Sequence, residues 1–222
     1  MTKHLSELES QKGTSFMSQF FQVHPDNPQV RLLQQAADIV RAGGVIVYPT
    51  DSGYALGCQI QNKDAVERIL RIRQLGSEHN FTLVCRDLSE LSIYAKVGNQ
   101  AFRLLKNNTP GPYTFVLRGT KEVPKRLLNP KRKTIGLRVP DNRIAQGLLA
   151  ELNEPLMSTT MIFPGEEFAE PDPYEIRLRL EKLVDLIIDG GHLMEKPTTV
   201  VDMVDDEIEV IRVGEGDPSP FN

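Results

Sequence analysis

The stretch 43–57 constrains the fold most, because it joins a helix stop, a buried strand and a polar turn within a short length of chain. Its glycine pair, Gly43-Gly44, is typical of the end of a helix. The apolar run 45–48 indicates a buried strand, which we expect Pro49 to end because proline has no N–H to donate. Thr50-Asp51-Ser52 then follows where open α/β sheets bind ligands. The pattern alone fits an ordinary polar loop equally well.

Helix-like and strand-like segments alternate along the rest of the chain, and strands cluster at its end. Helical periodicity and capping residues predict helices that begin near residues 28, 62, 88, 100, 142 and 174. Short apolar runs predict strands at 45–48, 58–60, 81–85, 113–117, 134–139, 155–160, 184–188, 198–203 and 208–212. This order favours one α/β domain built on a mixed sheet.

Local signals give predictions for helix starts and for the C-terminal tail. Short polar side chains accept hydrogen bonds from the free N–H groups that open a helix. We therefore expect capping by Asp26, Asp87, Asn99, Asp141 and Asp172. The tail 214–222 is rich in glycine, proline and acidic residues, so we expect it to be loosely held.

The beginning of the chain is distinct from this domain. Residues 1–16 are polar and precede a second plausible start at Met17. We expect 1–16 to be a natural extension or a leader added in cloning, and 17–222 to be one domain. The chain has no signal-peptide core and no run of about 18 apolar residues that would cross a membrane. These features predict a cytoplasmic protein without a membrane partner.

The cysteines and histidines do not indicate a metal site. Cys58 and Cys85 lack the spacing of metal ligands, and we interpret both as reduced thiols. The four histidines, at positions 4, 24, 79 and 192, form no cluster in the sequence. We therefore expect neither a fixed metal ion nor an organic cofactor.

The net charge of −4 is unevenly distributed. Nine Lys and Arg against two acids give residues 118–143 a charge of +7, whereas five against sixteen give residues 166–222 a charge of −11. A basic band in an acidic protein indicates an anion site or a face that binds nucleic acid. A solvated basic loop is the alternative.

Several separated motifs, in the same order along the chain from near Pro28 to Gly216, resemble those of the Sua5/YrdC/YciO/YwlC family, and most of all its YciO branch. The stretch 49–57, Pro-Thr-Asp-Ser-Gly-Tyr-Ala-Leu-Gly, is similar to the family's Pro-Thr-Glu-Thr-x-Tyr-Gly-Leu-Gly. The other motifs are Arg71-Ile72-Arg73, Pro110-Gly111-Pro112-Tyr113-Thr114, Leu137-Arg138-Val139-Pro140, Ser158-Thr159-Thr160, Thr199-Val200-Val201-Asp202 and Ile211-Arg212-Val213-Gly214.

The resemblance implies both a fold and an activity. The fold would be a twisted, mixed open sheet flanked by helices, with a positively charged concave cavity. The activity would be formation of threonylcarbamoyl-AMP from L-threonine, bicarbonate and ATP, a step in tRNA modification. Magnesium would arrive with the ATP.

The resemblance also assigns roles to individual residues. Phosphoryl transfer depends mostly on positioning and charge neutralisation, for which arginine is well suited. The nucleotide and its phosphates would contact Arg71, Arg73, Arg138, Ser158, Thr160 and Arg212, of which Arg71, Arg73 and Ser158 would be catalytic. Thr50, Ser52, Tyr54 and Thr114 would hold the amino acid or its carbamate. Taken singly, each hydroxyl is more often bonded to local backbone.

Two positions depart from the family pattern. Arg71 replaces a lysine, and its planar head group is larger than an ammonium group. Thr160 replaces an asparagine and so lacks an amide. Residues 71–74 with His79, Asn80 and Phe81 form, as a hypothesis, a distinct lid over the same pocket.

Three functions are therefore compatible with the sequence. The first is synthesis of threonylcarbamoyl-AMP. The second is a related enzyme that hydrolyses or transfers a carbamoyl- or acyl-adenylate, which the two departures favour. The third is binding of double-stranded RNA or tRNA, with which the family is also linked and which the basic band favours. Few aromatic residues lie near that band, so contact with a duplex backbone is a better expectation than base stacking.

Overall fold

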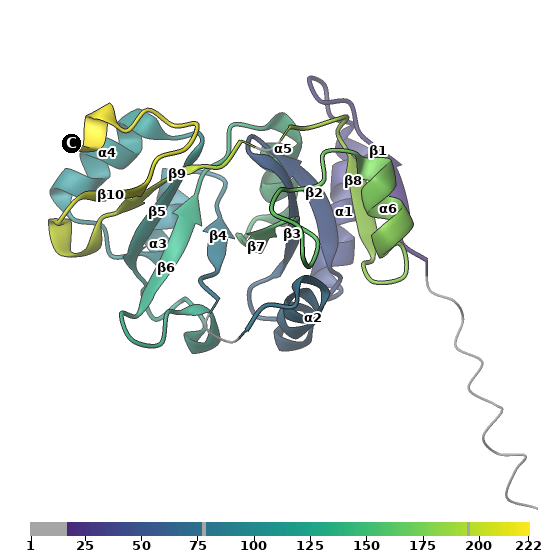
Figure 1. The fold of residues 1–222 in the computed structure, drawn as a ribbon, viewed down its shortest axis with the longest axis horizontal. Coiled ribbons are helices and arrows are strands. Elements are labelled where there is room, and N and C mark those ends of the chain that lie inside the picture. Colours follow the sequence, from purple (N-terminus) through teal and green to yellow (C-terminus); the bar gives the residue numbers. More distant parts are fainter. Residues whose placement is uncertain (1–16, 77–78, 195) are drawn as a thin grey trace, which may run out of the picture.

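A single twisted sheet runs through the computed structural model, which describes residues 17–76, 79–194 and 196–222 (Figure 1). Its strands are hydrogen-bonded in the order β1-β8-β2-β3-β7-β4-β6-β5-β9-β10. The strands are β1 (Gln19–Gln22), β2 (Ile46–Thr50), β3 (Gly53–Gln59), β4 (Thr82–Val84), β5 (Tyr113–Arg118), β6 (Thr134–Arg138), β7 (Leu156–Thr160), β8 (Leu186–Asp189), β9 (Thr199–Asp202) and β10 (Glu209–Arg212). Parallel and antiparallel pairs both occur, which confirms the α/β class and the mixed sheet.

Helices cover both faces of this sheet. They are α1 (Val30–Arg41), α2 (Lys63–Arg73), α3 (Leu88–Tyr94), α4 (Asn99–Asn108), α5 (Arg143–Leu152) and α6 (Pro173–Leu180). Short 3-10 turns lie at Lys125–Leu127, Val204–Asp206 and Ser219–Phe221. All six predicted helices are present, whereas β1 was not predicted. It adds in parallel to β8 at one end of the sheet.

The strand β2 is buried on both faces, because alternate side chains enter two separate apolar clusters. Val47 points into a large cluster that extends to α2 and β5. Ile46 and Tyr48 point into a second cluster with the apolar faces of α1 and α5. The sequence run 45–48 is therefore continuously apolar, as expected for a strand covered by helices on both sides.

The prediction that Pro49 ends the strand is wrong. Proline lies within β2 and is paired with Tyr54 of β3, in an antiparallel hairpin whose tight turn begins after Thr50. Pairing of β2 with β8 ends at Val47, so the missing N–H lies where one edge of the strand has no neighbour. Gly53 has a φ of +106°, which glycine adopts without strain, and it allows this turn.

Two of the predicted caps are confirmed. Asp87 Oδ1 accepts a hydrogen bond from the Glu90 N–H at 2.8 Å, and Glu90 reaches back to the Arg86 N–H at 2.6 Å. Asp172 caps α6 by accepting from the Tyr174 N–H at 2.8 Å.

Three other cap predictions are wrong. The helix α1 begins only after Gln29, because the N–H groups of Asp26 and Asn27 turn toward the His24 ring. Gly98 rather than Asn99 precedes α4. The cap of α5 is Asn142 and not Asp141, because Asn142 Oδ1 accepts a hydrogen bond from the Ala145 N–H at 3.0 Å.

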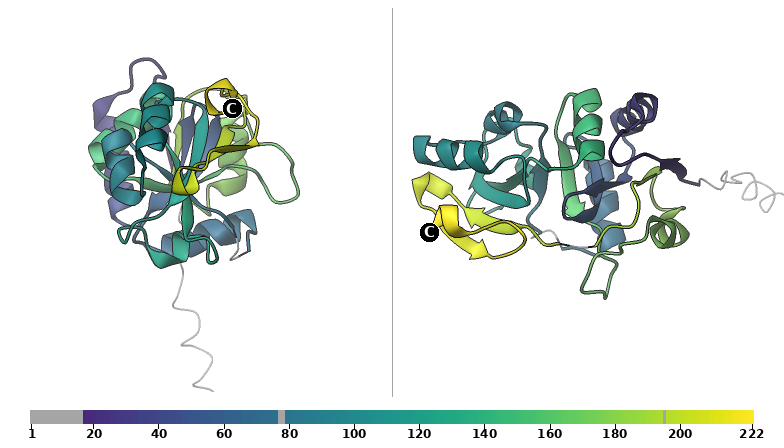
Figure 2. Two further views of the ribbon diagram at one scale, coloured as in Figure 1. Left: turned by 90° about the vertical axis from the view of Figure 1, so that its left-hand side faces the viewer. Right: turned by 90° about the horizontal axis from the view of Figure 1, so that it is seen from above.

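The C-terminal tail is anchored at two buried residues, Gly216 and Phe221, contrary to the prediction that it is loose. Phe221 is buried against the rings of Tyr113 and Phe115, with centroid distances of 5.5 and 6.0 Å. The Gly216 carbonyl also accepts a hydrogen bond from Thr199. The tail thus lies at the same end of the sheet as α4 (Figure 1 and Figure 2). The composition of the tail predicted a loose segment because it does not show that a single aromatic side chain, Phe221, anchors it.

Replacing Phe221 with alanine should lower the free energy of unfolding by about 3 kcal/mol, because it leaves a cavity beside two aromatic rings. Urea denaturation would measure the change. Phe168→Ala is the matched control, since Phe168 is 66% exposed and should cost little. Equal stability of the Phe221→Ala variant and the wild type would show that the tail does not contribute to the core.

Candidate functional site

A cavity of about 400 Å³ opens along the middle strands of the sheet, between the β2–β3 hairpin and the C-terminal strands. This volume lies within the range of small-molecule sites. Hydroxyl and guanidinium groups from separate parts of the sequence dominate its polar lining. They are Thr50, Ser52, Tyr54, Thr82, Thr114, Arg132, Thr134, Arg138, Ser158, Thr159, Thr160, Thr198 and Arg212.

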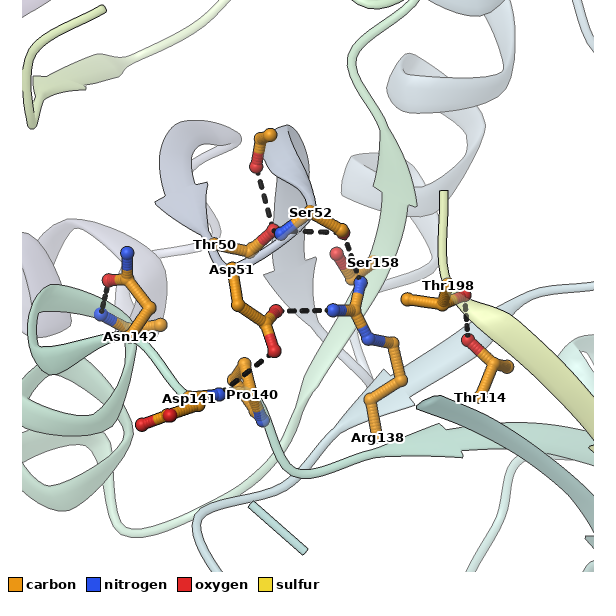
Figure 3. A network of polar contacts seen from close by, with 12 residues as sticks. Thr50, Asp51, Ser52, Thr114, Arg138, Pro140, Asp141, Asn142, Ser158 and Thr198 are labelled. Carbon is orange, nitrogen blue, oxygen red and sulfur yellow. Dashed lines mark hydrogen bonds and ion pairs between the residues drawn. The ribbon is translucent and has the colours of Figure 1, made fainter. Parts of the chain in front are cut away.

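The wall nearest the hairpin is built on Arg138, at the end of β6 (Figure 3). Its Nη1 donates to Ser52 Oγ at 2.8 Å, and its Nη2 donates to Asp51 Oδ1 at 2.5 Å. The second carboxylate oxygen of Asp51 accepts from the Asp141 N–H at 3.0 Å. Thr50 Oγ1 completes the network by donating to the Gly53 carbonyl at 2.7 Å. The hairpin turn is thereby tied to the strand and the loop that precede α5.

The Asp51–Arg138 ion pair is almost fully removed from water, with side chains that are 9% and 10% exposed. Burial raises the pKa of the Asp51 carboxyl, and the Arg138 guanidinium and the Asp141 N–H oppose that rise. Such a pair gives little net stability, but removing one partner leaves an uncompensated buried charge. The Nε of Arg138 is also buried and has no hydrogen-bond acceptor among the described residues.

The opposite wall contains Thr114 of β5 and Thr198, whose hydroxyl oxygens lie 2.8 Å apart. Arg212 at the end of β10 donates from Nε and Nη2 to the Thr198 carbonyl, at 3.1 and 2.9 Å. Tyr54 contributes little free polar surface, because its hydroxyl donates to the Gly191 carbonyl at 2.6 Å and accepts from the Gly190 N–H at 3.1 Å.

Three consecutive hydroxyl-bearing residues of β7, Ser158, Thr159 and Thr160, line the cavity. Ser158 Oγ lies 2.8 Å from the buried Tyr48 hydroxyl and donates to the Leu56 carbonyl at 3.2 Å. Thr159 Oγ1 lies 3.3 Å from His79 Nε2. Thr160, which stands in place of the family's asparagine, also lines the cavity.

The structure brings together eight of the ten predicted site residues, all except the two arginines of α2. Arg71 is exposed, and its Nε lies 3.4 Å from the Glu67 carbonyl of its own helix. Arg73 does not line the cavity either, but its charge acts on His79, which does. Residues i and i+2 point to different sides of a helix, which explains why the two arginines differ. Their catalytic roles remain predictions.

The proposed lid falls partly outside the described residues, which omit 77 and 78. Within the described part, His79, Asn80 and Phe81 line the cavity. Asn129 Nδ2 donates to Asn80 Oδ1 at 3.0 Å and so joins this segment to the basic band.

Sequence reasoning missed several lining residues, notably Thr82, Thr134, Thr159, Thr198 and Arg132. Only strand register could have identified some of them. Thr82 is paired with Gly136 of β6 and with Ser158 of β7, so it lies directly beside a predicted site residue. A threonine in a short strand carries no such signal by itself.

Several basic side chains of the band 118–143 form ion pairs or hydrogen bonds within the protein. Arg118 and Arg132 form ion pairs with Asp205 and Asp202, each at 2.6 Å. Arg126 donates to the Ile60 carbonyl at 2.7 Å. The acidic C-terminal part of the chain therefore neutralises part of the band, while Arg132 and Arg138 still line the cavity.

No cluster of three or more His, Cys, Asp or Glu side chains that could hold a metal ion occurs among residues 17–76, 79–194 and 196–222. No helix in the same part of the chain is long and apolar enough to cross a membrane.

Asp51→Asn should lower the free energy of unfolding by about 3 kcal/mol, because it leaves the Arg138 guanidinium buried without a counter-charge. Urea denaturation at neutral pH would measure it. Asp205→Asn provides a matched control, since it breaks an ion pair of similar length at an exposed position and should have a much smaller effect. A loss no larger than that of the control would contradict the importance of the buried pair.

His79 should titrate below its ordinary pKa of 6.5, because burial disfavours its charged form and the positive charge of Arg73 adds to that effect. Removing the charge with Arg73→Ala should raise the pKa of His79, whereas Arg71→Ala should leave it unchanged. NMR titration of the ring protons, assigned with a His79→Asn variant, would measure both. An equal shift in the two variants would contradict the different placement of the arginines.

Comparison with known proteins agrees with this geometry. The family model for Sua5, YciO and YrdC, described as telomere recombination, matches residues 38–214. The YciO protein of Escherichia coli is 68% identical over 92% of this chain and 100% of its own length. The crystal structure of Escherichia coli YciO superposes with a TM-score of 0.89 and covers 93% of this chain and 100% of that one.

More distant proteins carry functional names. A threonylcarbamoyl-AMP synthase of Vibrio vulnificus is 32% identical over 60% of this chain and 73% of its own length. The structure of Pyrococcus abyssi Sua5 complexed with L-threonine has a TM-score of 0.80 at 23% identity. The match covers 88% of this chain and 57% of that one, and it shows a similar fold. The match over most of the chain shows that it belongs to the Sua5/YciO/YrdC family.

Proposed function

We propose that this protein binds L-threonine, bicarbonate and ATP in the cavity and forms threonylcarbamoyl-AMP. One observation carries the proposal most directly. The buried Nε of Arg138 has no acceptor among the described residues, although the same guanidinium is otherwise held by Asp51 and Ser52. Buried donors in proteins are nearly always paired. Because Arg138 lines the cavity, an anionic group of the ligand, such as a carboxylate or a phosphate, would pair with its guanidinium charge.

The two walls of the cavity suit the two halves of such a ligand. The hairpin wall offers Thr50 and Ser52 beside Arg138, a compact polar site suited to an amino acid or its carbamate. The opposite wall offers Arg212 beside Thr114 and Thr198, which suits a phosphate chain. The reaction joins a carbamate oxygen to the α-phosphate and releases pyrophosphate, so its main demand is to hold both groups in line.

Similar proteins support this proposal. The synthase of Vibrio vulnificus carries the activity in its name, and the Pyrococcus abyssi protein was crystallised with L-threonine. Magnesium would enter as the complex with ATP and would neutralise charge on the phosphates.

Two residues favour a second candidate, an enzyme that hydrolyses or transfers an existing carbamoyl- or acyl-adenylate. The arginine that replaces the family's lysine, Arg71, is exposed and does not line the cavity. Thr160 does line the cavity but has no amide group. These changes affect the residues expected to serve the phosphates and leave the hairpin wall intact. The RNA-binding alternative stays a prediction, because no contact among the described residues favours it over these two.

The deciding experiment is pyrophosphate release from ATP with L-threonine and bicarbonate present, and with each omitted in turn. Threonine-dependent release is expected. Arg212→Ala should lower kcat/KM about tenfold to a hundredfold, because a charged hydrogen bond to phosphate contributes about 1.5–3 kcal/mol. Arg179→Ala removes an exposed arginine paired with Glu166 and should leave the rate unchanged.

Absence of release under all conditions would rule out the synthase reaction. Cleavage or transfer of preformed threonylcarbamoyl-AMP would then support the second candidate. A separate experiment would measure the affinity for duplex RNA at several salt concentrations. The affinity should fall steeply with salt if the protein contacts the RNA phosphates.

A further inference from the structure

Tyr48 contributes to the cavity without lining it. The side chain is fully buried, on the face of the sheet that α1 and α5 cover. It lies across β3 above Gly57, which is paired with Ser158 on β7. A Cβ at position 57 would stand 2.8 Å from Tyr48 Cε1, so only glycine lets the ring cross here. The crossing brings the Tyr48 hydroxyl to 2.8 Å from Ser158 Oγ.

The number of protons on the two hydroxyls decides which of them donates in the hydrogen bond between Tyr48 and Ser158. Ser158 Oγ also lies 3.2 Å from the Leu56 carbonyl, which can only accept. A serine hydroxyl has one proton and two lone pairs. Its proton points to Leu56, so the Tyr48 hydroxyl donates to Ser158. Burial raises the pKa of Tyr48 to about 12, so the phenol keeps the proton that it donates.

We propose that Tyr48 is a positioning residue that fixes the Ser158 hydroxyl so that it presents a lone pair to the cavity. This inference rests on the proposed function and refines it. One lone pair of Ser158 accepts from Tyr48, and the other is left for the ligand. Ser158 therefore receives a hydrogen-bond donor of the ligand, such as an ammonium, an amide N–H or a sugar hydroxyl. It does not bind a phosphate oxygen, which only accepts.

The assignment agrees with the division of the cavity. Arg138, Arg212 and Arg132 all line the cavity and carry the positive charge that acceptor groups such as phosphate and carboxylate require. A serine that presented a proton would duplicate their role. A serine held as an acceptor instead recognises the part of the ligand that arginine cannot contact.

Calorimetric titration of the full chain would test this with L-threonine, adenosine and magnesium pyrophosphate. The first two carry donors, on an ammonium and on sugar hydroxyls, whereas pyrophosphate offers acceptors. Ser158→Ala and Tyr48→Phe should each weaken binding of at least one of the donor ligands about three- to tenfold, the worth of one hydrogen bond. Both should leave pyrophosphate binding unchanged. The ligand that weakens identifies which donor Ser158 receives.

Tyr113→Phe is the matched control, because it also removes one hydrogen-bonded tyrosine hydroxyl, which in this case donates to the Asp217 carbonyl. Tyr113 belongs to the face of β5 that points away from Thr114 and the cavity, so its loss should change no affinity. Weaker pyrophosphate binding in Ser158→Ala or Tyr48→Phe would overturn the proposal, as would unchanged affinity for all three ligands.

A crystal structure of the Tyr48→Phe variant separates this inference from the proposed function. The side chain of Ser158 should leave its wild-type rotamer or occupy more than one, and an unchanged single rotamer would overturn the positioning role. If the wild-type protein released no pyrophosphate but the ligand affinities and the Ser158 rotamer changed as expected, the proposed reaction would be contradicted. The positioning role of Tyr48 would still stand.

Discussion

The buried ion pair between Asp51 and Arg138 is the interaction on which the cavity depends. It joins three segments that are distant in the sequence, because Asp51 in the hairpin turn binds both the end of β6 and the Asp141 N–H before α5. Two desolvated charges contribute little net stability. The pair matters for the geometry of the site, because it fixes the hairpin and holds the Arg138 guanidinium beside Ser52 in the cavity wall. The family's glutamate is an aspartate here, and the shorter side chain still spans this gap.

Sequence reasoning found the fold class, most elements and the motif that forms the hairpin wall. It succeeded where a local pattern decides the outcome, as at the Asp87 capping box and the apolar run of β2. It failed where a long-range partner decides. Asp141 matches the expected N-cap composition, but the N–H of that residue is bound by Asp51, and the next residue caps α5.

The candidate site shows the same limit more strongly. Threonines such as Thr82 and Thr198 become site residues only because the sheet order places β4 beside β7 and β9 beside β5. Conversely, Arg71 stands at the place of the lysine in a family motif, yet its position on α2 leaves it exposed. A motif fixes residue type and spacing, whereas the face of a helix or strand decides what the side chain reaches.

Most hydroxyls in the cavity are already engaged with the protein, and this limits what they offer a ligand. Thr50 donates to the Gly53 carbonyl, Tyr54 to the Gly191 carbonyl and Ser158 to the Leu56 carbonyl. Each hydroxyl has only one proton, so these groups keep lone pairs rather than protons for the cavity. The charged donors of the site are its arginines. A ligand that satisfies both sets must carry anionic acceptors and neutral or cationic donors together, and an amino acid and a nucleotide both combine the two.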